Sequence, residues 1–454
     1  MEKFNLGFVA DLFDQTLPSD QENLSIKKIY TDSREQVENG LFVPIVGERF
    51  DAHQFVNDII DKGAVATFWS HKEPPNNLPE DFPVIYVNDT IQALQQLAHA
   101  YRKQVDPLVI GVTGSNGKTT TKELIAACMQ AKYQTAKTEG NLNNHIGLPL
   151  TILHMDPDVE VLVAEMGMSD FGEIELLSKI AEPDHAVITN IGESHIEFLG
   201  SREGIARAKL EIKAGLKSDG RLLIDGDEPL LQQDEYANKI YCGFEPSNDY
   251  RVEAYQQNKD SMDVTINGAS FQLPLLGKHQ ALNAAFALAV SELLSIDREQ
   301  AIKQLESVAL PGMRFEKIET ADGALLINDA YNASATSMIA SLDVIKNMQI
   351  PRKIAVLADI LELGDYSEKA HRQVGQAIDH QFEAVYTYGT DSRYILDGLS
   401  DSFHGDRQHF SAKENLVNTI RTTMKNDTVV LFKGSRSMKL EEIIDELIQP
   451  KALD

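Results

Sequence analysis

The sequence predicts an α/β protein with three domains built on largely parallel sheets. Three observations support this fold class: the chain length, the alternation of strand-like and helical patterns, and the way the strand-like runs end. With 454 residues, the chain has room for two to four domains of ~100–200 residues each. Short apolar runs rich in β-branched residues alternate with helical patterns, and many of these runs close on Gly or Asp. Such an alternation is typical of parallel sheets with crossover helices.

Composition and charge limit the functions that need to be considered. Apolar residues make up 43% and charged residues 24% of the chain, so we expect all of it to fold. The 69 Asp and Glu residues outnumber the 42 Lys and Arg residues and give a formal charge of −27. This charge disfavours nucleic acid and anionic membranes as partners. Any anionic ligand therefore requires cations placed locally.

Cysteine usage and the N-terminus predict a soluble cytoplasmic protein. Cys128 and Cys242 are too few for a disulfide framework, and a bridge between them is possible but not expected. The first residues, MEKFNLGFVADLF, lack the features of a signal peptide. Because no run of about 18 apolar residues occurs, we expect no integral membrane segment.

Residues 1–105 form the first predicted domain, a small α/β module. Its strand-like pieces are short, and a Pro-rich break, HKEPPNNLPEDFP, interrupts them. The helical pattern TIQALQQLAHAYRKQV then leads through Pro107 into the next domain. The strand-like pieces are IKKIYTDSR, GLFVPIV, AVATFW and FPVIYVN.

Residues 106–311 form the second predicted domain and carry the clearest buried strands. These strands are PLVIGVTG, VEVLVAEMG, HAVITNIG and RLLIDGD. Each closes on Gly or Asp, as parallel strands that end in loops should. Ligands of such sheets bind at the carboxyl ends of the strands.

A glycine-rich loop follows the first of these strands. Residues 114–120 read GSNGKTT and precede the helical pattern TKELIAACMQ. Backbone N–H groups of such a loop surround phosphate oxygens, the Lys adds a charge, and the Thr reaches Mg²⁺. Val112 replaces the first Gly of the strict motif, so this is a variant phosphate loop. The alternative, a glycine-rich turn without a ligand, does not explain the order of strand, glycines, Lys-Thr and helix. The second domain is therefore predicted to be P-loop ATPase-like.

Other residues at the same sheet edge define the predicted ligand further. The Asn238-Lys239 pair has Tyr241 where a guanine-binding motif needs Asp, so ATP is the expected nucleotide. Glu165 lies at the end of VEVLVAEMG and His195 follows HAVITNIG, and both offer ligands for Mg²⁺ or Mn²⁺. A solvated Glu and a loop His are the alternatives when each residue is taken alone.

Residues 312–454 form the third predicted domain, a Rossmann-like α/β unit. Pro311-Gly312 marks the junction with the second domain. Helical stretches such as SEKAHRQVGQAIDHQF separate the strands ALLINDAYN, KIAVLADI, EAVYTYGT and TVVLFKGS.

Over essentially its whole length the chain resembles the Mur ligase family. Two departures occur: Asp51-Ala52-His53 stands where D-G-H is frequent, and YNASA at 331–335 stands where Y-N-A-N-P is frequent. The missing Pro loosens the second loop. The motifs that carry the resemblance, in chain order, are Asp32-Ser33-Arg34 with GLFVPIVGERFDAHQF, GVTGSNGKTTTK, EGNLNNHIGLPLT, AEMGMSDFGEI, ITNIGESHIEFLGS, ARAKLEI, GKHQALN, LPGMRFE, NDAYNAS, LADILELGDYS and FKGSRSMKLE.

The resemblance implies an ATP-dependent ligase that forms ADP and phosphate. It is strongest to members that join UDP-N-acetylmuramoyl-tripeptide to D-alanyl-D-alanine in peptidoglycan precursor synthesis, and it implies a monomer. Members that add the third peptide residue often carry D-N-P-R, which this sequence lacks. Folate polyglutamate ligases are a second alternative, but LELGDYSE and EGNLNNHIGLP favour the dipeptide-adding reaction. A third alternative is a nucleotide-dependent switch that binds ATP without ligation. The second metal site argues against it, because a protein that only binds ATP does not need one.

The resemblance also implies roles for individual residues. The family's two Mg²⁺ ions would be held by Thr119, Glu165, His195 and Lys209, with Lys209 carbamylated. The catalytic residues would be Lys118, Glu165, His195 and Lys209. The ATP phosphates would lie against Thr113, Gly114, Ser115, Asn116, Gly117, Lys118, Thr119 and Thr120. Asn283 would contact the adenine, and Arg314 and Asp329 would reach the nucleotide from the third domain. The UDP-linked substrate would contact Ser33, Arg34, Asn141, Asn143, Asn144 and Asn332.

Several of these residues have structural alternatives. Lys209 has Glu neighbours in a helical pattern and could form a surface ion pair. Arg314 could pair with an acid at the domain junction, and Asp329 could cap a turn. His279 is expected to pack within its own loop. Lys433 and Arg436 are cations near a strand end, suited to an anionic substrate or to solvent.

Overall fold

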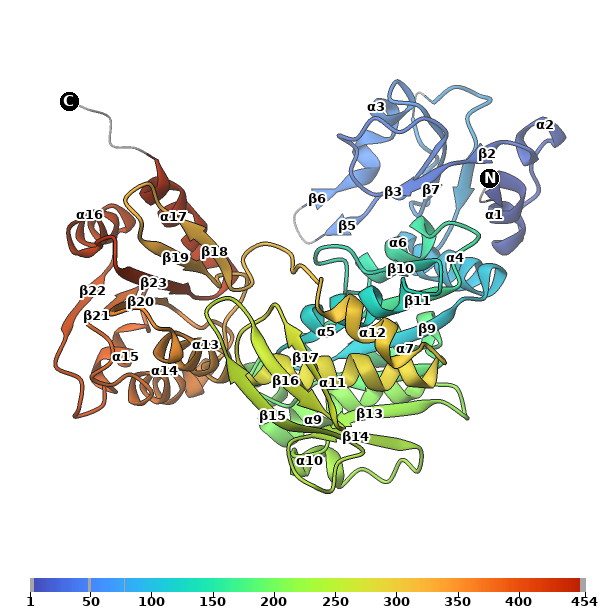
Figure 1. Ribbon diagram of the computed structural model, residues 1–454. Helices are drawn as coiled ribbons and strands as arrows, with labels where there is room; N and C mark the ends of the chain where they lie inside the picture. The colour runs from blue at the N-terminus through green and yellow to red at the C-terminus, as the bar shows by residue number, and fades with distance from the viewer. Residues whose placement is uncertain (1–3, 48–49, 77, 450–454) are drawn as a thin grey trace.

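The structure, a computed structural model, describes residues 4–47, 50–76 and 78–449. Three groups of elements follow one another along the chain, coloured blue, cyan to yellow, and orange to red in Figure 1. Each group is built on its own sheet, with four, nine and six strands respectively, which confirms the predicted α/β class. Within the described ranges, none of the helices combines the length and apolar character that spanning a bilayer requires.

The first group is a small parallel sheet whose strand order is β3-β4-β7-β8. These strands coincide with the four strand-like pieces of the sequence. Its elements are β1 (Phe4–Asn5), α1 (Leu6–Leu12), α2 (Ser19–Glu22), β2 (Ser25–Ile26), β3 (Lys28–Tyr30), β4 (Gly40–Phe42), β5 (Val46–Gly47), β6 (Phe50–Asp51), the 3-10 helix η1 (Ala52–Phe55), α3 (Val56–Ile60), β7 (Ala64–Trp69), β8 (Val84–Tyr86) and α4 (Thr90–Val105).

The second group is a nine-stranded sheet with the order β10-β11-β9-β12-β13-β14-β15-β16-β17. Its elements are β9 (Leu108–Thr113), α5 (Lys118–Met129), β10 (Thr135–Lys137), α6 (Gly147–His154), β11 (Val161–Glu165), α7 (Glu173–Ala181), β12 (His185–Ile188), α8 (Ile196–Leu199), α9 (Arg202–Leu210), η2 (Glu211–Ala214), β13 (Arg221–Asp225), α10 (Pro229–Gln232), β14 (Lys239–Gly243), β15 (Tyr250–Gln257), β16 (Met262–Ile266), β17 (Ala269–Leu273), α11 (Lys278–Leu293) and α12 (Arg298–Leu305).

Both faces of this central sheet are covered, as its apolar strands require. Along β9, Val109 belongs to one apolar cluster, whereas Ile110 and Val112 belong to another that includes α5 and α11. The sheet is parallel from β10 to β15. An antiparallel ribbon, β15 to β17, extends it and was not anticipated from the sequence.

The third group is a six-stranded sheet with the order β18-β19-β23-β20-β21-β22, parallel except for the β18–β19 pair. All four predicted strands are present as β19, β20, β21 and β23. Its elements are β18 (Glu316–Glu319), β19 (Leu325–Asn328), α13 (Ala335–Asn347), β20 (Arg352–Ala358), η3 (Gly364–Tyr366), α14 (Ser367–Gln376), β21 (Ala384–Tyr388), α15 (Arg393–Asp397), β22 (Asp406–Phe410), α16 (Lys413–Thr423), β23 (Thr428–Lys433), η4 (Arg436–Met438) and α17 (Leu440–Ile448).

Strand register brings the predicted phosphate loop and its neighbours to one edge of the central sheet. Glu165 at the end of β11 pairs with Val112 of β9, and Ile188 at the end of β12 pairs with Thr113. The loops that leave these three strands therefore start side by side. Cys128 and Cys242 are both buried and unbridged, as expected.

Helix α4 joins the first group to the second through a buried arginine. The Arg102 side chain is 2% exposed, and it donates to the carbonyl oxygens of Ala181 and Glu182 at 2.8 and 3.1 Å. It also pairs with Asp106 at 3.0 Å, where the helix ends in a left-handed residue. Arg102 thus satisfies carbonyl groups at the carboxyl end of α7.

We expect Arg102→Leu to lower the free energy of unfolding by ~2–4 kcal/mol, because it leaves buried carbonyl groups without donors. Urea unfolding followed by circular dichroism measures the change. Its neighbour Lys103 is 56% exposed, so Lys103→Leu is a matched control with an expected change of at most ~0.5 kcal/mol. Equal effects of the two substitutions would contradict the anchoring role of Arg102.

Candidate active site

A cavity of about 540 Å³ lies where loops of the central sheet meet loops of the third group. Most of the predicted site residues contribute to its wall. Those that do are Ser115, Asn116, Gly117, Lys118, Thr119, Thr120, Asn143, Asn144, Glu165, His195, Asn283, Arg314, Asp329 and Asn332. His279 and Lys433 also line it.

The phosphate loop has a backbone that only glycine permits at two positions. Gly117 has φ 80° and directly precedes α5. Gly114 has φ 148°, and a Cβ there would lie 1.9 Å from Thr189 Oγ1. Thr113 ends β9 beneath the loop and is fully buried. The loop therefore lies against the β12 edge and opens toward the start of α5.

The segment after β12 holds the phosphate loop in shape. Asn116 N–H donates to Asn190 Oδ1 at 3.0 Å, and the Asn116 carbonyl accepts from Thr189 Oγ1 at 2.6 Å. Ser115 Oγ accepts from the N–H of Gly192 at 2.9 Å. These contacts fix the loop before any ligand binds, which reduces the ordering cost of binding.

Lys118 supplies the loop's positive charge. Its Nζ donates to the carbonyl of Gly114 at 2.8 Å. Burial lowers the pKa of Lys118, the carboxylate of Glu165 raises it, and the cation of Arg314 lowers it again. The ammonium group is therefore held among backbone carbonyls at the position expected for contact with phosphate.

Glu165 is fixed by residues on both sides. Thr119 Oγ1 donates to Glu165 Oε2 at 2.9 Å, and Asn143 Nδ2 donates to Oε1 at 2.8 Å. The fully buried Lys122 places its Nζ 3.9 Å from the same carboxylate. Sequence reasoning missed Lys122, although its position one helical turn after Lys118 was a usable signal. The result is a set of oriented oxygen atoms beside the phosphate loop.

His195 and Lys209 lie within electrostatic range of Lys118. Burial lowers the pKa of His195, Glu362 raises it, and Lys118 and Lys209 lower it. Lys209 is 2% exposed, and burial holds its pKa well below the usual value. The alternative of a surface ion pair is wrong, because Lys209 is buried and Glu211 instead accepts from the N–H of Gly172 at 2.9 Å.

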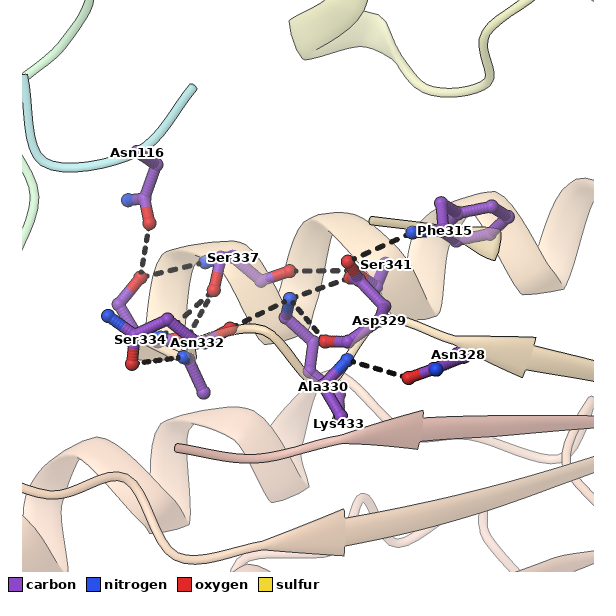
Figure 2. Close-up of polar contacts among 11 residues, drawn as sticks. Asn116, Phe315, Asn328, Asp329, Ala330, Asn332, Ser334, Ser337, Ser341 and Lys433 are labelled. Atoms are coloured by element: carbon purple, nitrogen blue, oxygen red, sulfur yellow. Dashed lines mark hydrogen bonds and ion pairs between the residues drawn. The ribbon is translucent and has the colours of Figure 1, made fainter. Parts of the chain in front are cut away.

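The third group contributes a second cation to the phosphate loop. Arg314 Nη2 donates to Thr119 Oγ1 at 2.7 Å, and its guanidinium stacks over the Tyr331 ring at 4.1 Å. Ser334 Oγ donates to Asn116 Oδ1 at 3.1 Å (Figure 2). Arg314 therefore contacts the loop itself instead of pairing with an acid at the junction.

Asp329 organises the third-group side of the cavity, as Figure 2 shows. It accepts from Lys433 Nζ and from Ser341 Oγ, both at 2.6 Å, and from the N–H of Phe315 at 3.2 Å. These contacts join three separate segments of the third group and are not those of a cap on the turn after β19, and Asp329 also lines the cavity. Lys433 is buried and paired with it, not solvated.

Asn283 and His279 lie on the α11 side of the cavity. Asn283 Oδ1 accepts from Thr121 Oγ1 at 3.1 Å, and its Nδ2 donates to Gln280 Oε1 at 2.9 Å. Its adenine contact stays a prediction. Burial lowers the pKa of His279 to about 4, against the opposing effect of Asp329, so the ring is neutral at physiological pH.

The lining of this cavity does not include Ser33, Arg34, Asn141 or Arg436, nor does it include Thr113, Gly114 or Lys209. The Ser33 carbonyl accepts from Lys62 Nζ at 2.7 Å, and Arg34 is 87% exposed and paired with Asp32. Asn141 is exposed, and Arg436 pairs with Glu441. Asn144 lines the cavity, and its Oδ1 accepts from the N–H groups of Ile146 and of Gly147, the first residue of α6.

A second polar cluster lies in the first group, beside a cavity of about 400 Å³. Asp51, His53 and His71 place ligand-type atoms within 4.8 Å of one another. However, His53 Nε2 accepts from the backbone N–H of Ser70 at 3.2 Å, while His53 Nδ1 lies 2.6 Å from Asp51 Oδ1. Both ring nitrogens of His53 are therefore engaged by protein partners. We assign this cluster to hydrogen bonding alone.

Three family models match the chain, and together they span most of it. The model described as the Mur ligase family, catalytic domain, matches residues 25–102. The Mur ligase middle domain matches residues 112–291, and the Mur ligase, glutamate ligase domain, matches residues 313–436.

Individual relatives and solved structures agree with these matches. The chain is 46% identical over 455 residues to the UDP-N-acetylmuramoyl-tripeptide–D-alanyl-D-alanine ligase of Bacillus subtilis, with 99% of each chain covered. It is 33% identical to the Escherichia coli enzyme of the same name, over 94% of each chain. A crystal structure of MurF from Acinetobacter baumannii superposes with a TM-score of 0.87 at 28% identity, covering 98% of this chain and 99% of that one. The MurF ligase of Thermotoga maritima in complex with ADP gives 0.82 at 30% identity, over 93% and 97%.

We expect Lys118→Ala to reduce ATP turnover by at least ~10²–10³-fold, because a preorganised charge that stabilises developing negative charge is lost. The fold should persist, since Lys118 lies at a loop end and contributes no apolar core contact. Phosphate release and ATP binding measure the change. Lys179→Ala is the matched control, because that lysine is 58% exposed on α7. Near wild-type turnover with normal ATP affinity would contradict the assignment of this loop.

Proposed function

This chain belongs to the Mur ligase family, and we propose that it joins D-alanyl-D-alanine to UDP-N-acetylmuramoyl-tripeptide with cleavage of ATP to ADP and phosphate. The observation that carries this proposal is 46% identity, over 99% of both chains, to a relative named for that reaction. The cavity supports it, because a phosphate loop on one sheet faces two cationic side chains, Arg314 and Lys433, from another.

The chemistry explains why the cavity concentrates positive charge. A carboxylate is a poor acyl donor because its leaving group would be oxide, so it is first phosphorylated to an acyl phosphate. This step brings an anion onto a triphosphate and requires charge neutralisation and in-line positioning. Lys118 and Arg314 reach the phosphate loop from opposite sheets and meet both requirements.

The residues present fit a divalent cation beside the phosphate loop. Thr119 Oγ1 and Glu165 Oε2 lie 2.9 Å apart, and Asn143 orients the carboxylate, so hard oxygen ligands suited to Mg²⁺ are already oriented. We propose that Thr119 and Glu165 hold one Mg²⁺ ion and that His195 and a carbamylated Lys209 hold a second. When bound, these ions neutralise negative charge on the reacting phosphate groups.

In the second step the amine of D-alanyl-D-alanine attacks the acyl carbon, a C–N bond forms, and phosphate leaves with the electrons of the C–O bond. Water would destroy the acyl phosphate, so the cavity must exclude it. The contacts of Arg314 with Thr119 and of Ser334 with Asn116 bring the third group over the phosphate loop. These contacts support a site that is complete only when the third group is docked on the central one.

The first group is proposed to hold the UDP part of the substrate. Support comes from the family match over residues 25–102 and from the exposed Ser33–Arg34 turn. We also propose residues 1–105, 106–311 and 312–454 as the three domains, and a monomer as the working form.

Phosphate release tests the proposed reaction. Wild-type protein with ATP and UDP-N-acetylmuramoyl-tripeptide should release phosphate at a steady rate only when D-alanyl-D-alanine is present. Mass spectrometry should then show a UDP-linked pentapeptide. Phosphate release that is independent of the dipeptide, without a pentapeptide, would favour a nucleotide-dependent switch and overturn the ligase assignment.

Lys209 provides a second test of the proposed site. Burial lowers its pKa and so favours the neutral amine, the form that adds CO₂ with loss of a proton to give an anionic carbamate. We expect Lys209→Ala to lose most activity and added acetate to restore part of it. Lys213→Ala, four residues further along the chain and paired with Asp234, is the control and should stay active. Normal turnover by Lys209→Ala would rule out the carbamate.

A further inference from the structure

Two loops from different sheets meet at His195. His195 directly precedes α8, in the loop that follows β12, and Glu362 lies between β20 and η3. His195 Nδ1 and a carboxylate oxygen of Glu362 form an ion pair. Both residues have left-handed backbones, with φ values of 63° and 61°. Non-glycine residues adopt this conformation at a cost of about 1–3 kcal/mol, and such strain is concentrated at functional sites.

Further contacts hold the same two loops together. The N–H of Glu197 donates to the Glu362 carbonyl at 3.4 Å, and the Tyr366 hydroxyl donates to the Gly200 carbonyl at 3.1 Å. Gly364 packs so closely that a Cβ there would lie 3.1 Å from Glu197 Cγ. The position of Glu362 against His195 is therefore set by docking of the third group onto the central one.

The contact determines which imidazole nitrogen faces a ligand. Because His195 Nδ1 lies against the Glu362 carboxylate, Nε2 is the ring nitrogen left to face a ligand. Histidines that bind metals usually donate their other N–H to a carboxylate or carbonyl, which fixes the ring and makes it a better ligand. Glu362 also adds a negative charge beside His195, close to the cation of Lys118.

We propose that Glu362 is a positioning residue that orients His195 for the second metal ion, so that this metal site is complete only when the third group is docked. This inference rests on the proposed function, which places a second ion at His195. It goes further by assigning a residue of the third group to that site. Binding of the ion and docking of the two groups then stabilise each other by the same free energy.

The test measures metal binding instead of activity. Wild-type protein with a non-hydrolysable ATP analogue is titrated with Mn²⁺ and followed by electron paramagnetic resonance. We expect Glu362→Gln to weaken one of two Mn²⁺ ions by ~10–100-fold and to leave the other unchanged. Asp365→Asn removes a charge from the same exposed loop without touching His195, and it should bind both ions like wild type.

A second variant distinguishes the orientation of His195 by Glu362 from a contact that only holds the two loops together. Tyr366→Phe removes the hydrogen bond to Gly200 but leaves the Glu362 contact, so it should retain both Mn²⁺ ions. If Tyr366→Phe weakens Mn²⁺ as much as Glu362→Gln does, or if Glu362→Gln binds both ions normally, the positioning role is overturned. Wild type that binds a single Mn²⁺ overturns the two-metal site itself and this inference with it. Dipeptide-dependent phosphate release by wild type shows whether the ligase assignment survives either result.

Discussion

The register of β9 against β11 and β12 is the constraint on which the site depends. Because the three strands are parallel and buried on both faces, their carboxyl ends reach one edge, and Glu165 pairs with Val112 while Ile188 pairs with Thr113. A shift of one residue would turn every side chain to the opposite face. The phosphate loop, Glu165 and the loop that ends at His195 are thus brought together by apolar packing within the sheet, away from the reacting groups.

Charge balance at this edge is local and differs from that of the whole molecule. The chain carries a formal charge of −27, yet Lys118, Lys122, Lys209 and Arg314 gather around the phosphate loop. Burial lowers the pKa of Lys118 and of Lys209, and the cation of Lys118 lowers that of Lys209 further. Glu165 provides the nearby negative charge, and Thr119 and Asn143 fix its orientation.

The third group completes this arrangement through a small number of polar contacts. Arg314 reaches Thr119, Ser334 reaches Asn116, and Glu362 reaches His195. Polar interfaces between domains permit relative motion more readily than large apolar ones. A ligase that must admit three substrates and then exclude water benefits from such an interface, because the same contacts that close the cavity also complete it.

The sequence by itself determined the α/β class, the phosphate loop and the strands around it. These features depend on glycine positions and apolar runs that are contained within a few consecutive residues. Only the tertiary structure revealed the β15–β17 ribbon, whose strands follow no strong local signal, and the roles of Lys122 and Glu362, which depend on contacts between distant segments. Lys209 shows the difference most clearly. Its helical pattern is compatible both with a surface ion pair and with a buried side chain. The packed fold buries Lys209 and so removes the first alternative.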